Sequence, residues 1–116
     1  MHDEHRAQVL QSELDRFIRI VCEQMQPERV VLFGSLAHGR VHEWSDLDLV
    51  VIADTDLPFL ERLRQVVRRV CPKVTMDLFV YTPAEWVLLK QSRPFIRDEV
   101  DAKGKVVYER PGAAVG

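Results

Sequence analysis

Residues 47–53 restrict the fold of this chain more than any other segment. They read Leu-Asp-Leu-Val-Val-Ile-Ala, so every position except Asp48 carries an apolar side chain. Successive side chains of a strand point to opposite faces, and a strand that is apolar at nearly every position is therefore buried on both faces. We expect residues 47–53 to form a central strand inside a sheet rather than a strand at its rim.

Hydrophobic periodicity predicts helices and strands over the rest of the chain. Apolar residues recur every three or four positions in amphipathic helices and form short runs in buried strands. Helices are expected over residues 9–25, 59–70 and 82–90, with one further turn or two within 94–102. Strands are expected over residues 29–33, 74–81 and 105–109. This order of elements predicts the α/β (α+β) class.

The chain has the size and composition of one domain. Its 116 residues are 47% hydrophobic and 29% charged, which is typical of a compact domain with its own core. We expect this domain over residues 1–110, followed by a disordered tail at 111–116 that has no apolar face to bury. The net charge of −2 lacks the basic surplus of a dedicated nucleic-acid-binding protein, so direct contact with nucleic acid is not expected.

Cysteine usage and hydropathy indicate the compartment. Cys22 and Cys71 are far apart and belong to no CxxC or Cys/His cluster. We therefore expect core thiols in a reducing compartment, not zinc ligands or a disulfide framework. No apolar run approaches the ~20 residues that span a bilayer. A cytoplasmic protein without membrane contact is expected.

Two carboxylates stand at the start of the predicted central strand. Residues two apart in a strand point to the same face and lie about 7 Å apart, so Asp46 and Asp48 are expected to share a face. Magnesium is commonly held by one or two carboxylates together with substrate phosphates. A position in a turn explains Asp46 equally well, since aspartate is common in turns. Asp48 is harder to explain in that way, because a buried unpaired carboxylate is costly.

Asp77 repeats the anomaly in the next predicted strand, where it is the only charged residue within 74–80. If that strand lies beside residues 47–53, three carboxylates converge, and their repulsion is relieved best by one or two divalent ions. The alternative is an ion pair between Asp77 and an arginine of the preceding helix. That helix carries four arginines, which we otherwise expect on a solvated face: Arg62, Arg64, Arg68 and Arg69.

A small-residue loop follows the first predicted strand. Gly34 lets the backbone turn sharply and approach a ligand closely, and the amides after it can donate to phosphate oxygens. Ser35 adds a hydroxyl donor. Gly34 and Gly39 have the glycine spacing of a Walker A loop, but Arg40-Val41 stands where Lys and Ser/Thr are required, so that assignment is rejected.

Gly34-Ser35, ten intervening residues, Asp46-x-Asp48 and a later lone Asp77 together resemble the active-site signature of the DNA polymerase beta-type nucleotidyltransferase superfamily. The short chain resembles its minimal nucleotidyltransferase (MNT) branch, and the resemblance covers roughly residues 29–83. It implies a nucleotidyltransferase fold with a small mixed sheet packed against helices. It also implies two Mg²⁺ ions on Asp46 and Asp48, with Gly34 and Ser35 binding the triphosphate. By the same resemblance, Asp77 contacts the catalytic metal and helps to deprotonate the acceptor hydroxyl.

The resemblance implies a Mg²⁺-dependent transfer of AMP from ATP to a hydroxyl group. MNT proteins typically work with a HEPN-domain RNase toxin, and members with all three carboxylates act as antitoxins by adenylylating a toxin tyrosine. This activity, in a hetero-oligomer with such a toxin, is the leading hypothesis. The alternatives are a non-catalytic antitoxin that masks its partner and a standalone transferase for a small molecule. Retention of all three carboxylates favours catalysis.

Several other residues near the expected site have two possible roles. His38 stands where many family members carry arginine. His38 and His42 both flank the site, and either could contact the substrate. A position at the surface is the simpler explanation for both histidines. Pairing with a protein would also give a reason for exposed aromatic residues, although packing in the core is the simpler explanation for each of them. These aromatic residues are Trp44, Trp86 and Phe95.

Overall fold

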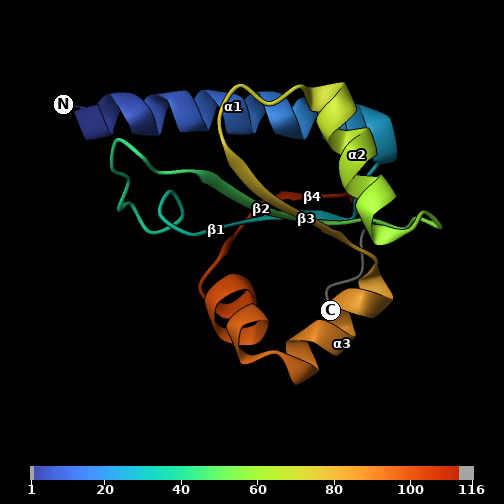
Figure 1. Ribbon diagram of the computed structural model, residues 1–116. Helices are drawn as coiled ribbons and strands as arrows, with labels where there is room; N and C mark the ends of the chain where they lie inside the picture. The colour runs from blue at the N-terminus through green and yellow to red at the C-terminus, as the bar shows by residue number, and fades with distance from the viewer. Residues whose placement is uncertain (1, 113–116) are drawn as a thin grey trace.

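A four-stranded mixed sheet in the order β3-β2-β1-β4 forms the centre of the computed structural model, which describes residues 2–112 (Figure 1). β1 pairs antiparallel with both β2 and β4, whereas β2 and β3 run parallel. The strands are β1 (Arg29–Phe33), β2 (Leu47–Ile52), β3 (Met76–Tyr81) and β4 (Lys105–Glu109). The predicted class and the mixed sheet packed against helices are confirmed.

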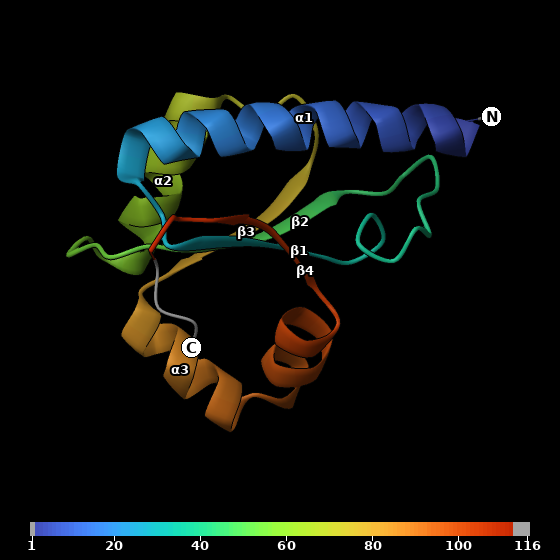
Figure 2. The same ribbon diagram turned by 180° about the vertical axis from the view of Figure 1, so that it is seen from behind.

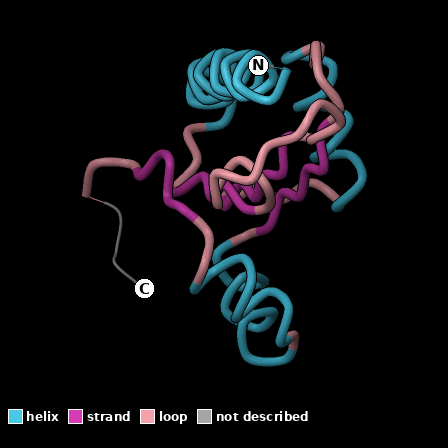
Figure 3. The backbone as a smooth tube through the Cα atoms, turned by 90° about the vertical axis from the view of Figure 1, so that its left-hand side faces the viewer, coloured by secondary structure: helices cyan, strands magenta, loops and turns pink. Residues whose placement is uncertain are grey.

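Helices cover both faces of this sheet. α1 and α2 lie on one face, and α3 and η1 lie on the other, as the two opposite views show (Figures 1 and 2). Viewed from the side, the sheet runs between these two helical layers (Figure 3). The helices are α1 (His2–Met25), α2 (Phe59–Val70), α3 (Pro83–Ser92) and the π-helix η1 (Ile96–Ala102). Among residues 2–112, none of these helices is long and apolar enough to cross a membrane.

β2 occupies the interior position predicted from its apolar run. Leu47, Leu49 and Val51 are fully buried and belong to the core beneath α1 and α2. Val50 and Ile52 point to the other face and pack with Trp86 of α3 and Val100 of η1. Because successive side chains of β2 pack into the cores on opposite faces of the sheet, the strand needs apolar residues on both faces.

Some element boundaries differ from the predicted ones: α1 begins at His2, seven residues earlier than the predicted start at residue 9. Thr82 caps α3 in a capping box with Glu85, as the Thr-Pro-Ala-Glu sequence predicts. The loop after Gly34 forms turns. β3 begins at Met76, two residues later than predicted. Residues 113–116, most of the tail that we expect to be disordered, lie outside the described residues.

The sequence-based burial assignments of Cys71, Trp44 and Phe95 are wrong. Cys71 is exposed because it closes α2 in the left-handed conformation, at φ 48°. Core packing was the simpler explanation for three aromatic residues, but only Trp86 of these three is buried. Trp44 is 79% exposed and Phe95 is 59% exposed. Trp44 lies in the turn before β2 and Phe95 at the start of η1, where helical and strand periodicity gives no information about burial.

Arg62 does not belong to the solvated face of α2 predicted for its four arginines. Its side chain is 7% exposed and makes a short ion pair with Glu85 of α3, 2.6 Å between Nη1 and Oε1. The same guanidinium donates to the carbonyl oxygens of Leu57 and Val80, at 2.8 and 3.1 Å. The hydrogen bond from Arg62 lowers the pKa of Glu85. Arg62 therefore joins α2, β3 and α3.

Replacement of Arg62 by leucine should lower the free energy of unfolding by about 2–3 kcal/mol, since charged hydrogen bonds are lost and two carbonyl groups are left without their donor. Urea denaturation at neutral pH measures this. The matched control is Arg64→Leu on the same helix, where the arginine is 65% exposed, and its effect should stay within about 0.5 kcal/mol. Equal losses for the two variants would contradict the structural role of Arg62.

Candidate active site

Asp48 and Asp77 stand directly opposite each other on neighbouring strands. The parallel register of β2 and β3 pairs these two residues. Asp48 shares a face of β2 with Val50 and Ile52, which places it on the side of the sheet covered by α3 and η1. The two carboxyl groups are close enough for Asp77 to raise the pKa of Asp48. Asp77 is exposed and Asp48 is half-buried, so the pair lies at the surface of this face.

The pKa of Asp48 is raised to about 7. Burial is the largest cause, followed by the hydrogen bond to Asp77, the charge of Asp77 and, last, the charge of Asp46. Among residues 2–112, no ion pair joins a basic side chain to any of these three carboxylates. The alternative in which Asp77 pairs with an arginine of α2 is therefore wrong.

Asp46 precedes Asp48 by two residues, and its charge adds to the rise in the pKa of Asp48. In the part of the chain that the structure describes, no group of three or more His, Cys, Asp or Glu side chains is close enough to hold a metal ion by itself. The structure thus brings together two of the three predicted carboxylates, with Asp46 two residues before Asp48. Two carboxylates completed by phosphate oxygens are a usual donor set for Mg²⁺. The oxygen donors of Asp48 and Asp77, which have no cation of their own, fit such an ion.

Gly34 lies against this pair of carboxylates. Its φ is +77°, and a Cβ atom built there would overlap the carboxylate of Asp48. Only glycine meets both requirements, because other residues are strained at this φ and have a Cβ. The end of β1 is therefore in direct contact with the carboxylate site, as the register of Phe33 opposite Asp48 also shows.

The loop after Gly34 presents free backbone donors. The carbonyl oxygen of Ser35 accepts hydrogen bonds from the amides of His38 and Arg40, at 3.2 and 2.9 Å, which closes the loop into a tight turn. Within residues 2–112, the amides of Ser35, Leu36 and Ala37 donate no hydrogen bond to protein. Amides of this kind next to a metal site can donate to phosphate oxygens.

Arg6 and Ser45 hold the chain just before Asp46, and the sequence analysis missed both. The Nε and Nη2 atoms of Arg6 donate to the carbonyl oxygen of Ser45, at 3.0 and 2.9 Å. The buried hydroxyl of Ser45 accepts from the amide of His42 at 2.8 Å. α1 thereby fixes the approach to β2. No local pattern reveals this contact, because it joins residues 39 positions apart.

A basic hollow lies beside the loop, on the side of η1. It has a volume of about 300 Å³ and is lined by His38, Arg40, Glu99 and Lys103. Lys103 is paired with Glu99 at 3.0 Å. Both His38 and His42 are exposed, as expected for surface residues. The hollow therefore places positive charge next to the loop that follows Ser35.

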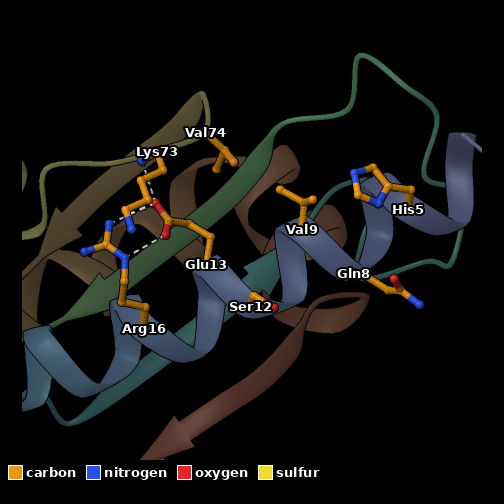
Figure 4. A pocket seen from close by; sticks show the side chains of 8 residues that line it. All are labelled: His5, Gln8, Val9, Ser12, Glu13, Arg16, Lys73 and Val74. Atoms are coloured by element: carbon orange, nitrogen blue, oxygen red, sulfur yellow. Dashed lines mark hydrogen bonds and ion pairs between the residues drawn. The ribbon is translucent and has the colours of Figure 1, made fainter.

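A second hollow, of about 360 Å³, lies on the opposite side of the sheet between α1 and the segment before β3 (Figure 4). Its carboxylate, Glu13, accepts from Arg16 at 2.8 Å and from the amide of Lys73 at 2.6 Å. The hydrogen bond from Arg16 is the main reason why the pKa of Glu13 is lowered. Because both of its oxygens accept hydrogen bonds, Glu13 ties α1 to the segment before β3, and this hollow is structural. The residues lining it are His5, Gln8, Val9, Ser12, Glu13, Arg16, Lys73 and Val74.

Comparison with known proteins gives consistent results. The family described as "Nucleotidyltransferase domain" matches residues 14–106. A "Probable protein adenylyltransferase MntA" of Haemophilus influenzae is 36% identical over 56 residues, which are 47% of this chain, and the chain spans only about half of that relative, 49% of its length.

Solved structures are similar as well. The crystal structure of a putative nucleotidyltransferase from Sulfolobus solfataricus has a TM-score of 0.70 at 17% identity, covering 99% of this chain and 94% of the other. This similarity shows a shared fold. A structure titled "Crystal structure of the toxin-antitoxin with AMP-PNP" has a TM-score of 0.48 at 21% identity, over 82% of this chain and 72% of the other.

Gly34→Ala should destabilise the protein more than Gly39→Ala does. Both glycines have positive φ, +77° and +67°, but a Cβ at Gly39 meets nothing within 4 Å, whereas one at Gly34 overlaps Asp48. Both variants lose about 1 kcal/mol to backbone strain, and Gly34→Ala should lose roughly 1–3 kcal/mol more from overpacking. Urea unfolding in EDTA measures the difference. Equal losses would show that Gly34 is not confined by the carboxylate.

Asp48→Asn should change how stability depends on pH. The folded pKa of about 7 lies above the value of about 4 in an unfolded chain, so the folded state holds the extra proton between these values. Wild-type stability should therefore fall as pH rises through this window. In EDTA, the melting temperature of Asp48→Asn should gain on wild type between pH 5 and pH 8, by an amount on the order of a few degrees.

The control for this prediction is Asp54→Asn, which changes an exposed carboxylate just after β2. Its melting curve should run parallel to that of wild type across the same pH range. Mg²⁺ at pH 8 should reduce the advantage of Asp48→Asn, because an ion relieves the carboxylate repulsion only in wild type. Parallel pH profiles for Asp48→Asn and wild type would refute the raised pKa.

Proposed function

This chain belongs to the nucleotidyltransferase domain family, and we propose that it transfers AMP from ATP to a hydroxyl group in a Mg²⁺-dependent reaction. The main support for this proposal is the position of two carboxylates. Asp48 and Asp77 meet across the β2–β3 pair with no basic partner among residues 2–112, directly beside the loop that begins at Gly34. Structural carboxylates are normally paired, and unpaired ones with a raised pKa are typical of functional sites.

The proposed roles follow from the position of each group. Mg²⁺ held by Asp48 and Asp77, with Asp46 at the margin, would neutralise charge on the attacking and leaving oxygens. Ser35 and the free amides of Leu36 and Ala37 donate to the triphosphate. The exposed carboxylate of Asp77 accepts the proton of the acceptor hydroxyl. No histidine is needed as a base.

The basic hollow beside the loop supports the orientation of the triphosphate. His38 and Arg40 of the loop line this hollow together with Glu99 and Lys103. A triphosphate whose α-phosphate lies at Asp48 and whose outer phosphates run along the loop would end near these groups. The positive charge of Arg40 then favours departure of pyrophosphate, because preorganised charge stabilises a leaving group better than solvent does.

For the acceptor, we favour a tyrosine of a partner HEPN-domain RNase toxin, with this chain as its antitoxin. The similarity to a protein adenylyltransferase supports a protein acceptor. So does the shape of the site: the carboxylates lie at the surface, Asp77 is exposed, and the aromatic side chains of Phe79 and Phe95 are exposed on the same side of the sheet. A partner that covers this surface would complete the site.

The decisive test incubates the protein with ATP labelled at the α-phosphate, Mg²⁺ and a HEPN-domain RNase from the same operon. Label should appear on a tyrosine of the RNase. Asp77→Asn should lower the labelling rate by about 10²–10⁴-fold, the usual contribution of a positioned proton acceptor. Asp48→Asn should abolish it. Asp56→Asn, an exposed carboxylate outside the site, should label at the wild-type rate.

Other outcomes identify the alternatives. A stable complex without label would show a masking antitoxin, and nucleotide transfer to a small molecule alone would show a standalone transferase. Undiminished labelling by both Asp48→Asn and Asp77→Asn would refute the assigned site.

A further inference from the structure

β3 is an edge strand of the sheet, and no strand among residues 2–112 pairs with its outer side. The strand order β3-β2-β1-β4 leaves one side of β3 unpaired. In Figure 1, β3 lies in front of the other strands, and no other described helix or loop crosses in front of it. Proteins usually blunt such edges with charges, bulges or a covering helix, because the free backbone groups of an edge bind other strands.

The direction of the free backbone groups follows from the β2–β3 ladder. The carbonyl oxygens of Thr75 and Tyr81 accept from the amides of Leu47 and Ala53, at 3.0 and 2.9 Å, and so point towards β2. Backbone groups alternate along a strand. Those of Asp77 and Phe79 therefore also point towards β2. The outward-pointing residues are Met76, Leu78 and Val80.

Only part of this edge is available. The carbonyl oxygen of Val80 accepts from Nη1 of Arg62 at 3.1 Å, which closes the end of the edge nearer α3. Within residues 2–112, the outward-pointing backbone amide and carbonyl groups of Met76 and Leu78 have no hydrogen-bond partner. The open edge is thus a short stretch centred on Asp77.

Aromatic side chains continue from Asp77 along the same face. Phe79 is 36% exposed, and its ring stacks on Tyr81 with 6.1 Å between centroids and 4° between planes. Phe33 lies 6.5 Å from Phe79 and 6.4 Å from the exposed ring of Phe95. A side chain arriving beside Asp77 therefore meets an aromatic surface.

We infer that the β3 edge binds an extended segment of the acceptor protein as an added strand, with a tyrosine beside Phe79 whose hydroxyl reaches towards Asp77 and Asp48. This inference rests on the proposed function and names the form of its acceptor. Free amides and carbonyls in a row are matched by another extended backbone, as in other cases of strand addition. A helix would leave them unpaired.

The distances favour a long hydroxyl side chain such as tyrosine. Strands lie about 4.8 Å apart, so an added strand is roughly 10 Å from β2, which carries Asp48. A serine or threonine opposite Asp77 ends far short of that position. A tyrosine opposite Phe79 can pack its ring on the exposed phenylalanine and lean along the strand towards Asp77, since residues on one face are about 7 Å apart.

In this arrangement the tyrosine hydroxyl is the nucleophile and pyrophosphate is the leaving group. The phenol oxygen forms a bond to the α-phosphorus of ATP while the bond from phosphorus to pyrophosphate breaks. The phenol proton passes to the carboxylate of Asp77. The products are an AMP-tyrosine phosphodiester and pyrophosphate.

The test uses the wild-type protein with Mg²⁺, α-labelled ATP and a seven-residue peptide of alternating threonine and valine with a central tyrosine. Two N-methylated forms are compared, one methylated at the tyrosine and one at the residues on either side of it. These amides point to opposite sides of an added strand. One methylated peptide should be labelled at least about tenfold more slowly than the parent peptide. The other should be labelled at the rate of the parent peptide.

Equal behaviour of the two methylated peptides would overturn the inference, as would labelling of a serine peptide at the rate of the tyrosine peptide. If Mg²⁺-ATP binds in calorimetry but the parent peptide is not labelled, the edge is not the acceptor site, while transfer to the RNase still tests the proposed function. If Mg²⁺-ATP does not bind, the proposed function fails first.

A protein variant tests the same edge from the other side. Met76→Pro removes an outward amide at the first residue of β3, a position where strands tolerate proline, and leaves the β2 ladder intact. Peptide labelling should fall about tenfold or more, with affinity for Mg²⁺-ATP unchanged. Met76→Leu keeps the amide and should label normally. Equal labelling by both would contradict strand addition; if Met76→Pro fails to fold, the methylated peptides decide.

Discussion

The parallel pairing of β2 with β3 is the interaction on which the rest of the structure depends. It sets Asp48 against Asp77 in register, an arrangement that electrostatics alone would drive apart. Burial of Leu47, Leu49 and Val51 beneath α1 and α2 opposes that repulsion, because it removes most of the apolar surface of β2 from water. The two carboxylates meet because the hydrophobic side chains of the same strand leave them no other position.

Several features converge on this pair. Gly34 permits the close approach of β1, Arg6 holds the chain before Asp46, and Arg62 joins α2 to the far end of β3. A stable protein without a function would gain by replacing Asp48 with an apolar residue. A local conflict of this kind, surrounded by contacts that maintain it, is what functional sites show.

Local signals predicted the class and the strands, and they marked the carboxylates. The apolar run of β2 made Asp48 conspicuous, and the Thr82 capping box is encoded within four residues. Contacts between distant segments were missed. Arg62 looked like a surface residue because helical periodicity cannot show that Val80 and Glu85 lie beside it, and Phe95 looked like a core residue because hydrophobicity alone does not fix burial. The spacing of Asp46, Asp48 and Asp77 predicted neighbours, but only the fold shows that Asp48 and Asp77 stand in register on adjacent strands.

The guanidinium of Arg62 also bears on self-association. An unpaired sheet edge can pair with the same edge of another copy of the chain, and repeated pairing of this kind produces fibres. Proteins commonly prevent this by keeping the unpaired stretch of the edge short. By occupying the carbonyl of Val80, Arg62 leaves room for a few residues of a guest chain and too little for an unlimited ladder between identical molecules. A single ion-paired side chain thus limits the length of backbone that another chain can pair with at this edge.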